Sequence, residues 1–319
     1  LRPQAHEIIR TWLFSTVVRS HLEDDRLPFS DAAISGWILD PDRKKMSKSK
    51  GNVVTPMGLL EKHGSDAVRY WAASGRPGTD TAFDEGQMKI GRRLAIKILN
   101  ASRFVLLSAG DDVSEEATPQ AVTEQLDLAM LAALRQVVAD ATTAMIDYNY
   151  TRALESAETF FWKFCDDYLE LVKARAGAED DSQARRSARA ALRLALSVQL
   201  RLFAPFLPFV TEEVWSWWRP GSVHHTAWPQ PDELGEGGDP AVLTEVGLVL
   251  GGVRKAKSEA KVGMRTEVET VTVSAPDAAR DRVASASADL VAAGRIAEIT
   301  WASADTLTVT DVRLAPPAP

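Results

Sequence analysis

The sequence of 319 residues predicts a mostly α-helical chain, with a short α/β part before a helical bundle and a small α+β part after it. Three observations predict this class. Apolar residues recur at helical spacing in long segments between residues 56 and 219. Before these segments, short apolar stretches punctuated by Gly36 are typical of strands and bends. After them, residues 267–273, 296–301 and 307–314 read as strands, the first by clear alternation.

The composition is that of a soluble globular protein, with 45% apolar and 25% charged residues. No apolar run approaches the roughly 20 residues that a membrane helix needs, so no membrane partner is expected. A single cysteine, Cys165, excludes an internal disulfide and is typical of a reducing cytosol, which predicts a cytoplasmic protein. One cysteine and five histidines predict no protein-bound metal. The net charge of -7 does not indicate a nucleic-acid binder, although local patches matter more than the sum.

A lysine-rich stretch lies near the start of the chain, and no acidic residue occurs from position 43 to position 60. It reads Lys44-Lys45-Met46-Ser47-Lys48-Ser49-Lys50-Gly51-Asn52. A cationic loop of this kind is suited to close over a polyphosphate and to stabilise the charge that grows as a phosphate ester breaks. The Gly-Asn pair favours a mobile turn. The alternative is a solvated basic loop or a nuclear-localisation-like run.

The order of residues in this stretch is more specific than its charge. Lys45-Met46-Ser47-Lys48-Ser49, continued by Lys50-Gly51-Asn52-Val53-Val54, resembles the second signature of the class I aminoacyl-tRNA synthetases of the valine, isoleucine and leucine group. The resemblance implies the end of a Rossmann-type α/β catalytic domain, with this loop at the carboxyl edge of its sheet. It makes Lys48 the expected ligand of the ATP phosphates, supported by Lys45, while Met46, Ser47 and Ser49 shape the loop. The other catalytic signature of the family, His-Ile-Gly-His, does not occur in the sequence.

Glu7 is a second candidate for nucleotide binding. Apolar positions from Ile8 to Val17 predict a helix that begins near Gln4. The resemblance matches Glu7 with a carboxylate that holds the ribose of the adenylate, and a carboxylate is suited to accept hydrogen bonds from a diol. The alternative is an acid in the first turn of a helix, favoured by the helix dipole. His6 is expected to be structural.

Three further stretches extend the resemblance. Residues 64–71, with Thr79-Asp80 and Phe83-Asp84, resemble the valine enzymes more than the isoleucine ones. Residues 153–170 resemble the anticodon-binding bundle of the valine group, and residues 203–215 are another stretch that resembles the family. The resemblance therefore implies four parts: a catalytic-domain remnant with the lysine loop at 1–58, stem-contact and connecting helices at 59–110, an anticodon-binding helical bundle at 111–235, and a small α+β domain with a disordered tail at 236–319.

Two basic groups are candidates for tRNA binding. The helix predicted at 87–108 carries Lys89, Arg92, Arg93 and Lys97 with no acid between them, which is a suitable surface for phosphates. Its alternative is a solvated face. Arg185, Arg186 and Arg189 form the second group, which no acidic residue follows until Glu212.

Two residues of the predicted helix at 151–175 have expected structural roles. Thr151 is suited to cap the start of that helix. Cys165 lies on its apolar face with no histidine near it in sequence, so a buried small side chain is favoured over a catalytic thiol.

The resemblance implies that the chain is the C-terminal part of a ligase that activates valine with ATP and transfers it to tRNA(Val). ATP would arrive with Mg²⁺, ATP and valine would bind mainly through the part that precedes this chain, and a monomer is expected. The chain alone should be a poor enzyme, since the first half of the nucleotide fold and an editing domain are missing. The alternatives are a non-catalytic tRNA-binding module and the equivalent part of an isoleucine enzyme.

Overall fold

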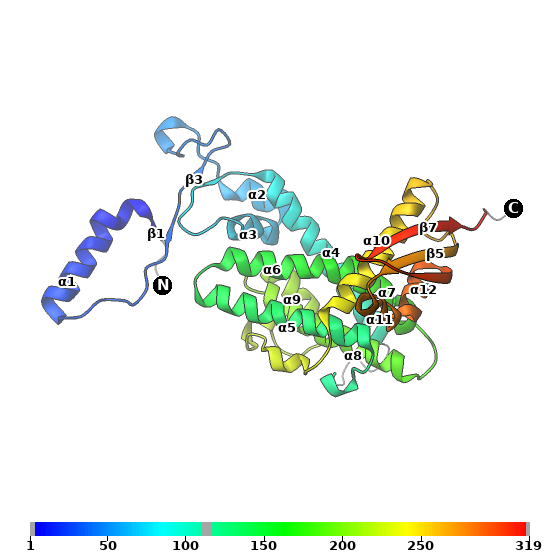
Figure 1. Ribbon diagram of the computed structural model, residues 1–319. Coiled ribbons are helices and arrows are strands. Elements are labelled where there is room, and N and C mark those ends of the chain that lie inside the picture. Colours follow the sequence, from blue (N-terminus) through cyan, green and yellow to red (C-terminus); the bar gives the residue numbers. More distant parts are fainter. Residues whose placement is uncertain (1–3, 110–116, 317–319) are drawn as a thin grey trace. The chain divides into compact units, whose positions relative to one another are not determined.

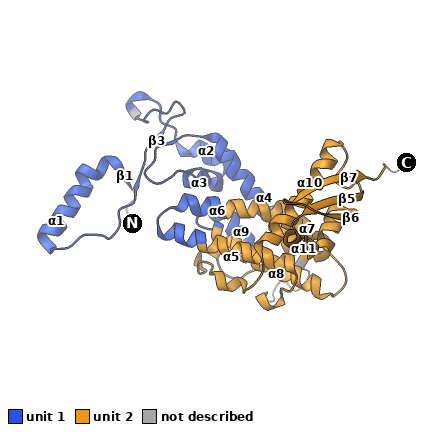
Figure 2. Ribbon diagram, in the orientation of Figure 1, with its two compact units in different colours: residues 1–99, 140–156, 203–214 blue, residues 100–139, 157–202, 215–319 orange. Residues whose placement is uncertain are grey.

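The computed structural model describes residues 4–109 and 117–316 (Figure 1). Most of the tail expected at 316–319 and most of the acidic linker expected at 109–120 lie outside these residues. Two compact units make up the chain: unit 1 holds residues 1–99, 140–156 and 203–214, and unit 2 holds residues 100–139, 157–202 and 215–319 (Figure 2). Most of the described residues are helical and the sheets are small, which confirms the predicted mostly α class.

Unit 1 begins with two parallel strand pairs. β1 (Gln4–Ala5) pairs with β2 (Ile34–Ser35), and β3 (Ile38–Leu39) pairs with β4 (Thr81–Ala82). Between β1 and β2 lie the 3-10 turn η1 (His6–Ile8), the π turn η2 (Ile9–Leu13) and the helix α1 (Phe14–Asp24). The predicted helix start near Gln4 is wrong, because Gln4 and Ala5 pair with a strand 30 residues further along the chain.

Three helices follow in unit 1. α2 (Pro56–His63) and α3 (Ser65–Ala73) are separated at Gly64, whose φ of +85° confirms the predicted break at this glycine. The long helix α4 (Glu85–Ala109) comes next. Asp66 in the first turn of α3 accepts hydrogen bonds from the backbone N–H groups of Phe209 (3.1 Å) and Val210 (2.8 Å). These are first-turn donors of α9 (Pro208–Ser216), so Asp66 joins α3 to α9.

The remaining helices of the bundle are α5 (Gln125–Ile146), α6 (Tyr150–Lys163), the π turn η6 (Phe164–Tyr168), α7 (Leu169–Ala176) and α8 (Gln183–Phe203). The helix predicted at 151–175 therefore has a π turn at its centre. Cys165 lies in that turn and is buried, as expected. Residues 192–202 alternate like a strand, but their Ala, Leu and Arg content favours the helix that α8 forms.

The predicted cap at Thr151 is wrong. Helix α6 already begins at Tyr150, and the side chain of Asn149 accepts a hydrogen bond from the backbone N–H of Arg152. The Thr151 hydroxyl instead donates to the carbonyl oxygens of Ala73 (3.0 Å) and Gly75 (3.1 Å) at the end of α3. Thr151 thus satisfies carbonyls that the last turn of α3 leaves open.

Helix α5 is the one described helix long and apolar enough to cross a membrane by length and composition. Of its most apolar stretch, 44% is buried inside the protein. Leu126 and Leu134 of α5 are fully buried. The core helix of a bundle has the same length and composition, so we interpret α5 as a core helix.

The last part of unit 2 has an α+β arrangement. Its elements are α10 (Pro240–Glu259), β5 (Val268–Ala275), α11 (Asp277–Ala284), α12 (Ser287–Gly294), β6 (Ile296–Ser303) and β7 (Thr308–Leu314). The sheet has the order β6-β5-β7, with β6 parallel and β7 antiparallel to the central strand. The single helix predicted at 276–293 is two helices, which meet at Ser285 and Ala286. Short 3-10 turns precede this domain: η5 (Pro119–Ala121), η7 (Val223–His225) and η8 (Pro231–Leu234).

A buried lysine gives a direct test of this domain's packing. Lys257 of α10 is 2% exposed, and its Nζ donates to the carbonyl oxygens of Met264 (3.1 Å) and Gly294 (2.8 Å). Replacing Lys257 with methionine should lower the free energy of unfolding by about 1–3 kcal/mol, because two carbonyls lose their donor. Urea unfolding followed by circular dichroism measures this change.

Lys255→Met is the matched control for this substitution. Lys255 lies on the same helix, with a side chain that is 76% exposed. Its replacement should change the free energy of unfolding by less than about 0.5 kcal/mol. An equal loss in both variants would show that the two carbonyl contacts of Lys257 do not stabilise the domain.

Candidate functional site

The lysine loop, defined as Lys44–Asn52, leaves the carboxyl end of β3 and leads to α2. Residues Leu39 and Lys45 form an antiparallel bridge across the turn that starts the loop. Within this turn the backbone N–H of Asp40 donates to the carbonyl of Lys44 (2.9 Å). Residues Lys48–Lys50 form the 3-10 turn η3. Since β3 and β4 are parallel, the loop lies at the edge of the strand pair where α/β sheets bind ligands.

Two polar side chains close the lysine loop. The buried carboxylate of Asp40 accepts hydrogen bonds from the backbone N–H of Lys44 (2.7 Å) and from Nδ2 of Asn52 (2.7 Å). These two donors, the Lys44 N–H first, lower the pKa of Asp40. The Asn52 side chain also accepts from the N–H of Ser47 (2.9 Å) and donates to the carbonyl of Lys45 (3.3 Å). Asp40 and Asn52 therefore define the shape of the loop, a role that the sequence reasoning missed.

The candidate Glu7 contacts Lys45, a residue of the lysine loop. Lys45 Nζ is 3.0 Å from Oε1 and 3.2 Å from Oε2 of Glu7. The indole N–H of Trp37 donates to Oε2 of the same carboxylate (2.9 Å), and the Lys45 ammonium lies 4.3 Å from the centre of a Trp37 ring. Lys45 and then Trp37 hold the pKa of Glu7 below its usual value. His6 contributes an aromatic contact to Trp37, with ring centres 4.3 Å apart.

The other predicted loop residues have different surroundings. Met46 and Ser47 are half-buried, and Ser49 is exposed. The hydroxyl oxygens of Ser47 and Ser49 lie 3.2 Å apart, within hydrogen-bond distance. The side chain of Lys48 lies outside the described part of the structure, although its backbone begins η3.

The four predicted tRNA-binding residues of α4 differ in their exposure to solvent. Lys89, Arg92 and Arg93 are exposed, while Lys97 is half-buried. Arg92 also donates to the carbonyl of Lys62 at the end of α2 (3.2 Å). At the first residue of α4, Glu85 contacts Lys62 (2.5 Å) and His63 (3.1 Å), and these two partners lower its pKa.

The arginines at the start of α8 contact the turn that precedes the helix. Arg185 donates to the carbonyl of Asp180 (2.6 Å), and Arg186 forms an ion pair with Asp181 (2.9 Å). Arg189 donates to the carbonyl of Ala176 (3.2 Å). Each of the three therefore has a local structural partner in addition to its predicted role at a tRNA surface.

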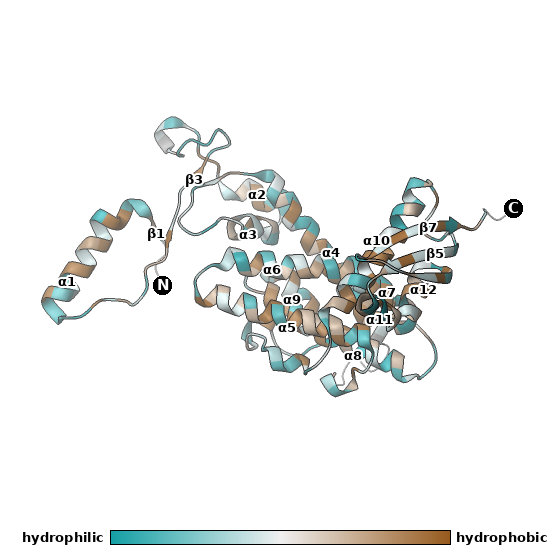
Figure 3. Cartoon of the chain, in the orientation of Figure 1, coloured by the Kyte–Doolittle hydropathy of each residue, from teal (hydrophilic) through white to brown (hydrophobic). Residues whose placement is uncertain are grey.

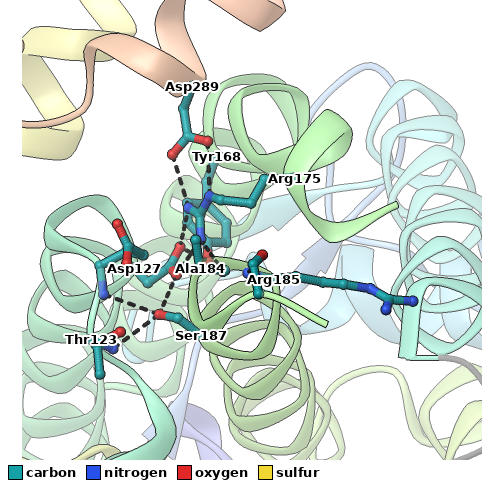
Figure 4. Close-up of polar contacts among 10 residues, drawn as sticks. Thr123, Asp127, Tyr168, Arg175, Ala184, Arg185, Ser187 and Asp289 are labelled. Carbon is teal, nitrogen blue, oxygen red and sulfur yellow. Dashed lines mark hydrogen bonds and ion pairs between the residues drawn. The ribbon is translucent and has the colours of Figure 1, made fainter. Parts of the chain in front are cut away.

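A buried polar cluster in unit 2 is the feature that sequence reasoning missed most completely (Figure 4). Arg175 of α7 pairs with Asp127 of α5 through Nη1 (2.8 Å) and Nη2 (2.9 Å). The same guanidinium pairs with Asp289 of α12 through Nε (2.9 Å) and Nη2 (2.8 Å). Asp127 also accepts from the hydroxyls of Tyr168 (2.8 Å) and Ser187 (2.7 Å).

The cluster is structural. Asp127 is 0% exposed, and burial, followed by the charge of Asp127, raises the pKa of Tyr168 well above its usual value. Arg175 joins α5 and α7 of the bundle to α12 of the α+β domain. Within residues 4–109 and 117–316, no group of three or more His, Cys, Asp or Glu side chains is placed to hold a metal ion.

Two protein families match the chain. Residues 4–84 match the family of class I tRNA synthetases for isoleucine, leucine, methionine and valine, and this segment contains Glu7, Trp37 and the lysine loop. Residues 127–273 match the anticodon-binding domain of tRNA ligases, which covers the bundle from α5 onward and reaches into β5.

Curated valine–tRNA ligases are similar over nearly the whole chain. The ligase of Thermobifida fusca is 64% identical over 320 residues, which cover 99% of this chain and 36% of that protein. The Salinispora tropica ligase is 57% identical, covering 98% and 38%, and that of Leifsonia xyli is 54% identical, covering 98% and 36%. The chain thus spans somewhat more than a third of the relatives it matches.

A solved structure shows the same fold at low sequence identity. It is the ternary complex of a LeuRS with tRNA and LeuAMS from Agrobacterium radiobacter K84. The likeness has a TM-score of 0.56 at 17% identity and covers 85% of this chain and 31% of that one. This structure shows the fold alone, whereas the two family models and the curated relatives show what the sequence resembles: the chain is similar to class I tRNA synthetases and their anticodon-binding domain, and to valine–tRNA ligases over nearly its whole length.

Proposed function

We propose that the chain is the part of a cytoplasmic valine–tRNA ligase that binds the ATP phosphates and the tRNA. The observation that carries this proposal is the position of the lysine loop. It follows β3 at the carboxyl end of a parallel strand pair, within the segment that the class I synthetases match. The identity to valine–tRNA ligases supports valine over isoleucine as the amino acid.

The proposed reaction joins valine to AMP in its first step. The valine carboxylate attacks the α-phosphorus of ATP, a bond forms between them, and the bond to the β-phosphate oxygen breaks and releases pyrophosphate. Mg²⁺ that arrives with ATP neutralises part of the phosphate charge. Lys48 and Lys45 supply further positive charge where the pyrophosphate departs, and Glu7 accepts hydrogen bonds from the ribose. In the second step a hydroxyl of the terminal ribose of tRNA(Val) attacks the carbonyl carbon of the valyl group, the bond from that carbon to the phosphate oxygen breaks, and AMP leaves.

Exposed apolar side chains in the first part of unit 1 support a larger catalytic domain. Phe14 and Leu22 of α1 are 62% and 77% exposed, and Leu27 beyond it is 69% exposed. Hydrophobic and hydrophilic residues both occur along α1 in Figure 3. We propose that the remaining part of a ligase covers these exposed side chains and completes the amino-acid pocket.

Charging of tRNA(Val) by a chimeric ligase tests the proposed function. In this protein, here called the chimeric ligase, the chain replaces the matching part of the Thermobifida fusca enzyme. We expect the chimeric ligase to attach valine to tRNA(Val). The Thermobifida fusca enzyme is the positive control. If it is active while the chimeric ligase binds tRNA but attaches no valine, the result would favour the alternative that the chain is a non-catalytic tRNA-binding module.

The basic side of α4 gives a separate prediction about tRNA. The combined change Lys89→Ala, Arg92→Ala and Arg93→Ala should weaken tRNA(Val) binding by the chain about tenfold or more. It should also reduce the slope of log K against log salt by up to about 3, because each phosphate contact contributes roughly one. Titration with tRNA(Val) at several salt concentrations measures both quantities.

A triple variant of equal charge is the control. Arg10, Arg19 and Arg26 are also exposed in unit 1, and their replacement by alanine removes the same three charges. This variant should keep its affinity within about twofold. If both triple variants lose affinity equally, net charge and not the α4 surface determines binding.

A further inference from the structure

Trp37 contacts both Glu7 and Lys45, two of the nucleotide-binding candidates of the proposed function. Its indole N–H donates to Glu7, and the Lys45 ammonium rests over its ring. We propose that Trp37 is a positioning residue that holds the Glu7 carboxylate in place and keeps Lys45 beside it until ATP binds. This inference rests on the proposed function, in which Lys45 moves to the phosphates and Glu7 binds the ribose.

The backbone of Trp37 is fixed by the segment before β4. Its N–H donates to the carboxylate of Asp80 (2.8 Å), and its carbonyl accepts from the N–H of Thr81 (2.9 Å). The preceding Gly36 allows this close approach, since an added Cβ would lie 2.2 Å from the carbonyl oxygen of Thr79. The backbone N–H and carbonyl of Trp37 are therefore both hydrogen-bonded, which fixes the position of the indole that contacts Glu7 and Lys45.

The ion pair between Lys45 and Glu7 is suited to open. The side chains of Lys45 and Glu7 are 51% and 45% exposed, and exposed ion pairs contribute little to stability. The several negative charges of ATP can therefore compete with Glu7 for the Lys45 ammonium. Trp37 donates to Oε2 only, so the departure of Lys45 leaves Oε1 open to a hydroxyl of the ribose. Without the indole N–H, Glu7 would lose both described side-chain partners when Lys45 moves.

The reactivity of Lys45 tests this arrangement in the chain itself. Trace acetylation followed by mass spectrometry measures the ratio of the acetylation rate of Lys45 to that of Lys50 in the same loop. Trp37→Leu and Glu7→Gln should each raise this ratio about threefold or more, because the ammonium loses a partner. Trp37→Phe keeps a ring under the ammonium and should raise the ratio less. An unchanged ratio in Trp37→Leu and Glu7→Gln would overturn the inference.

Steady-state kinetics of the chimeric ligase test the positioning of Glu7. Trp37→Phe removes the N–H and should raise the KM for ATP about tenfold, with the KM for valine within twofold. Trp71→Phe is the matched control, because the Trp71 indole also donates one hydrogen bond in unit 1, to the carbonyl of Ala82 (3.3 Å). It should leave both KM values unchanged. A fall in kcat with both KM values unchanged in Trp37→Phe would show a merely structural tryptophan.

The two tests separate the inference from the proposed function. A chimeric ligase with no activity before any substitution would count against the proposed function. The acetylation ratio does not depend on that activity, so it still decides whether Trp37 and Glu7 hold Lys45. An active chimeric ligase whose KM for ATP does not respond to Trp37→Phe would refute the positioning role alone.

Discussion

Replacing Lys48 with alanine is expected to lower valine-dependent exchange of pyrophosphate into ATP by the chimeric ligase about 100- to 1,000-fold. The reason is that one preorganised donor to a developing negative charge contributes about 2.7–4 kcal/mol to transition-state stabilisation. The loss should lie in kcat, with a smaller change in the KM for ATP, because the charge on the departing pyrophosphate grows as the bond breaks. The measurement is the initial rate of exchange over a range of ATP concentrations.

Lys50→Ala is the control for this prediction. Lys50 lies two residues further along in η3 and carries the same charge. Its replacement should lower the exchange rate by less than about threefold, since a solvated lysine adds little to the local field. Equal losses in the two variants would mean that the net charge of the loop, and not Lys48, supports the reaction. A loss confined to the KM for ATP would mean that Lys48 only binds the substrate.

Replacing Arg175 with methionine should lower the free energy of unfolding by about 3–5 kcal/mol, because the change leaves buried carboxylates without a cation. Asp127 is fully buried, and Asp289 is 8% exposed. Urea unfolding at pH 7 measures the loss. Arg186→Met is the control: its side chain is 55% exposed and pairs with Asp181, so its loss should stay below about 1 kcal/mol.

The pH dependence of the Arg175→Met variant follows from the carboxylates. Burial already raises the pKa of Asp289, against the lowering effect of Arg175, and removing the guanidinium leaves burial to raise it further. A folded-state pKa above the unfolded value stabilises the protein at low pH, and this contribution is lost as the pH rises through the folded pKa. The free energy of unfolding that Arg175→Met loses relative to the unchanged protein should therefore be smaller at pH 4 than at pH 7. Adding Asp127→Asn and Asp289→Asn should recover more than half of it, and no recovery would contradict the buried-charge explanation.

Most of the helices were predictable, because their apolar periodicity extends over many residues. The exceptions depend on residues far away in the chain. Gln4 and Ala5 form a strand because Ile34 and Ser35 pair with them. Thr151 does not cap its helix, which already begins at Tyr150, and its hydroxyl donates to the carbonyls of residues 73 and 75 instead. Local propensity carries no information about such partners.

The candidate site was predictable where one continuous stretch carries it. The lysine loop has a specific order of residues, and the basic residues of α4 recur at helical spacing. Asp40, Asn52 and Trp37 have no local pattern, and the indole of Trp37 meets a carboxylate 30 residues earlier in the chain. The members of the buried cluster are more distant still, since Arg175 pairs with acids 48 and 114 residues away. In the sequence Arg175 and its two acidic partners each resemble an ordinary surface charge.

The most direct test of the proposed valine–tRNA ligase function is the amino-acid dependence of pyrophosphate exchange by the chimeric ligase. Valine and isoleucine are supplied separately, at equal concentrations, without tRNA. We expect exchange with valine at a rate close to that of the Thermobifida fusca ligase, and exchange at least tenfold slower with isoleucine, whose extra methylene a valine pocket has to reject. Exchange that isoleucine supports as well as valine, or no exchange with either amino acid, would contradict the proposed function.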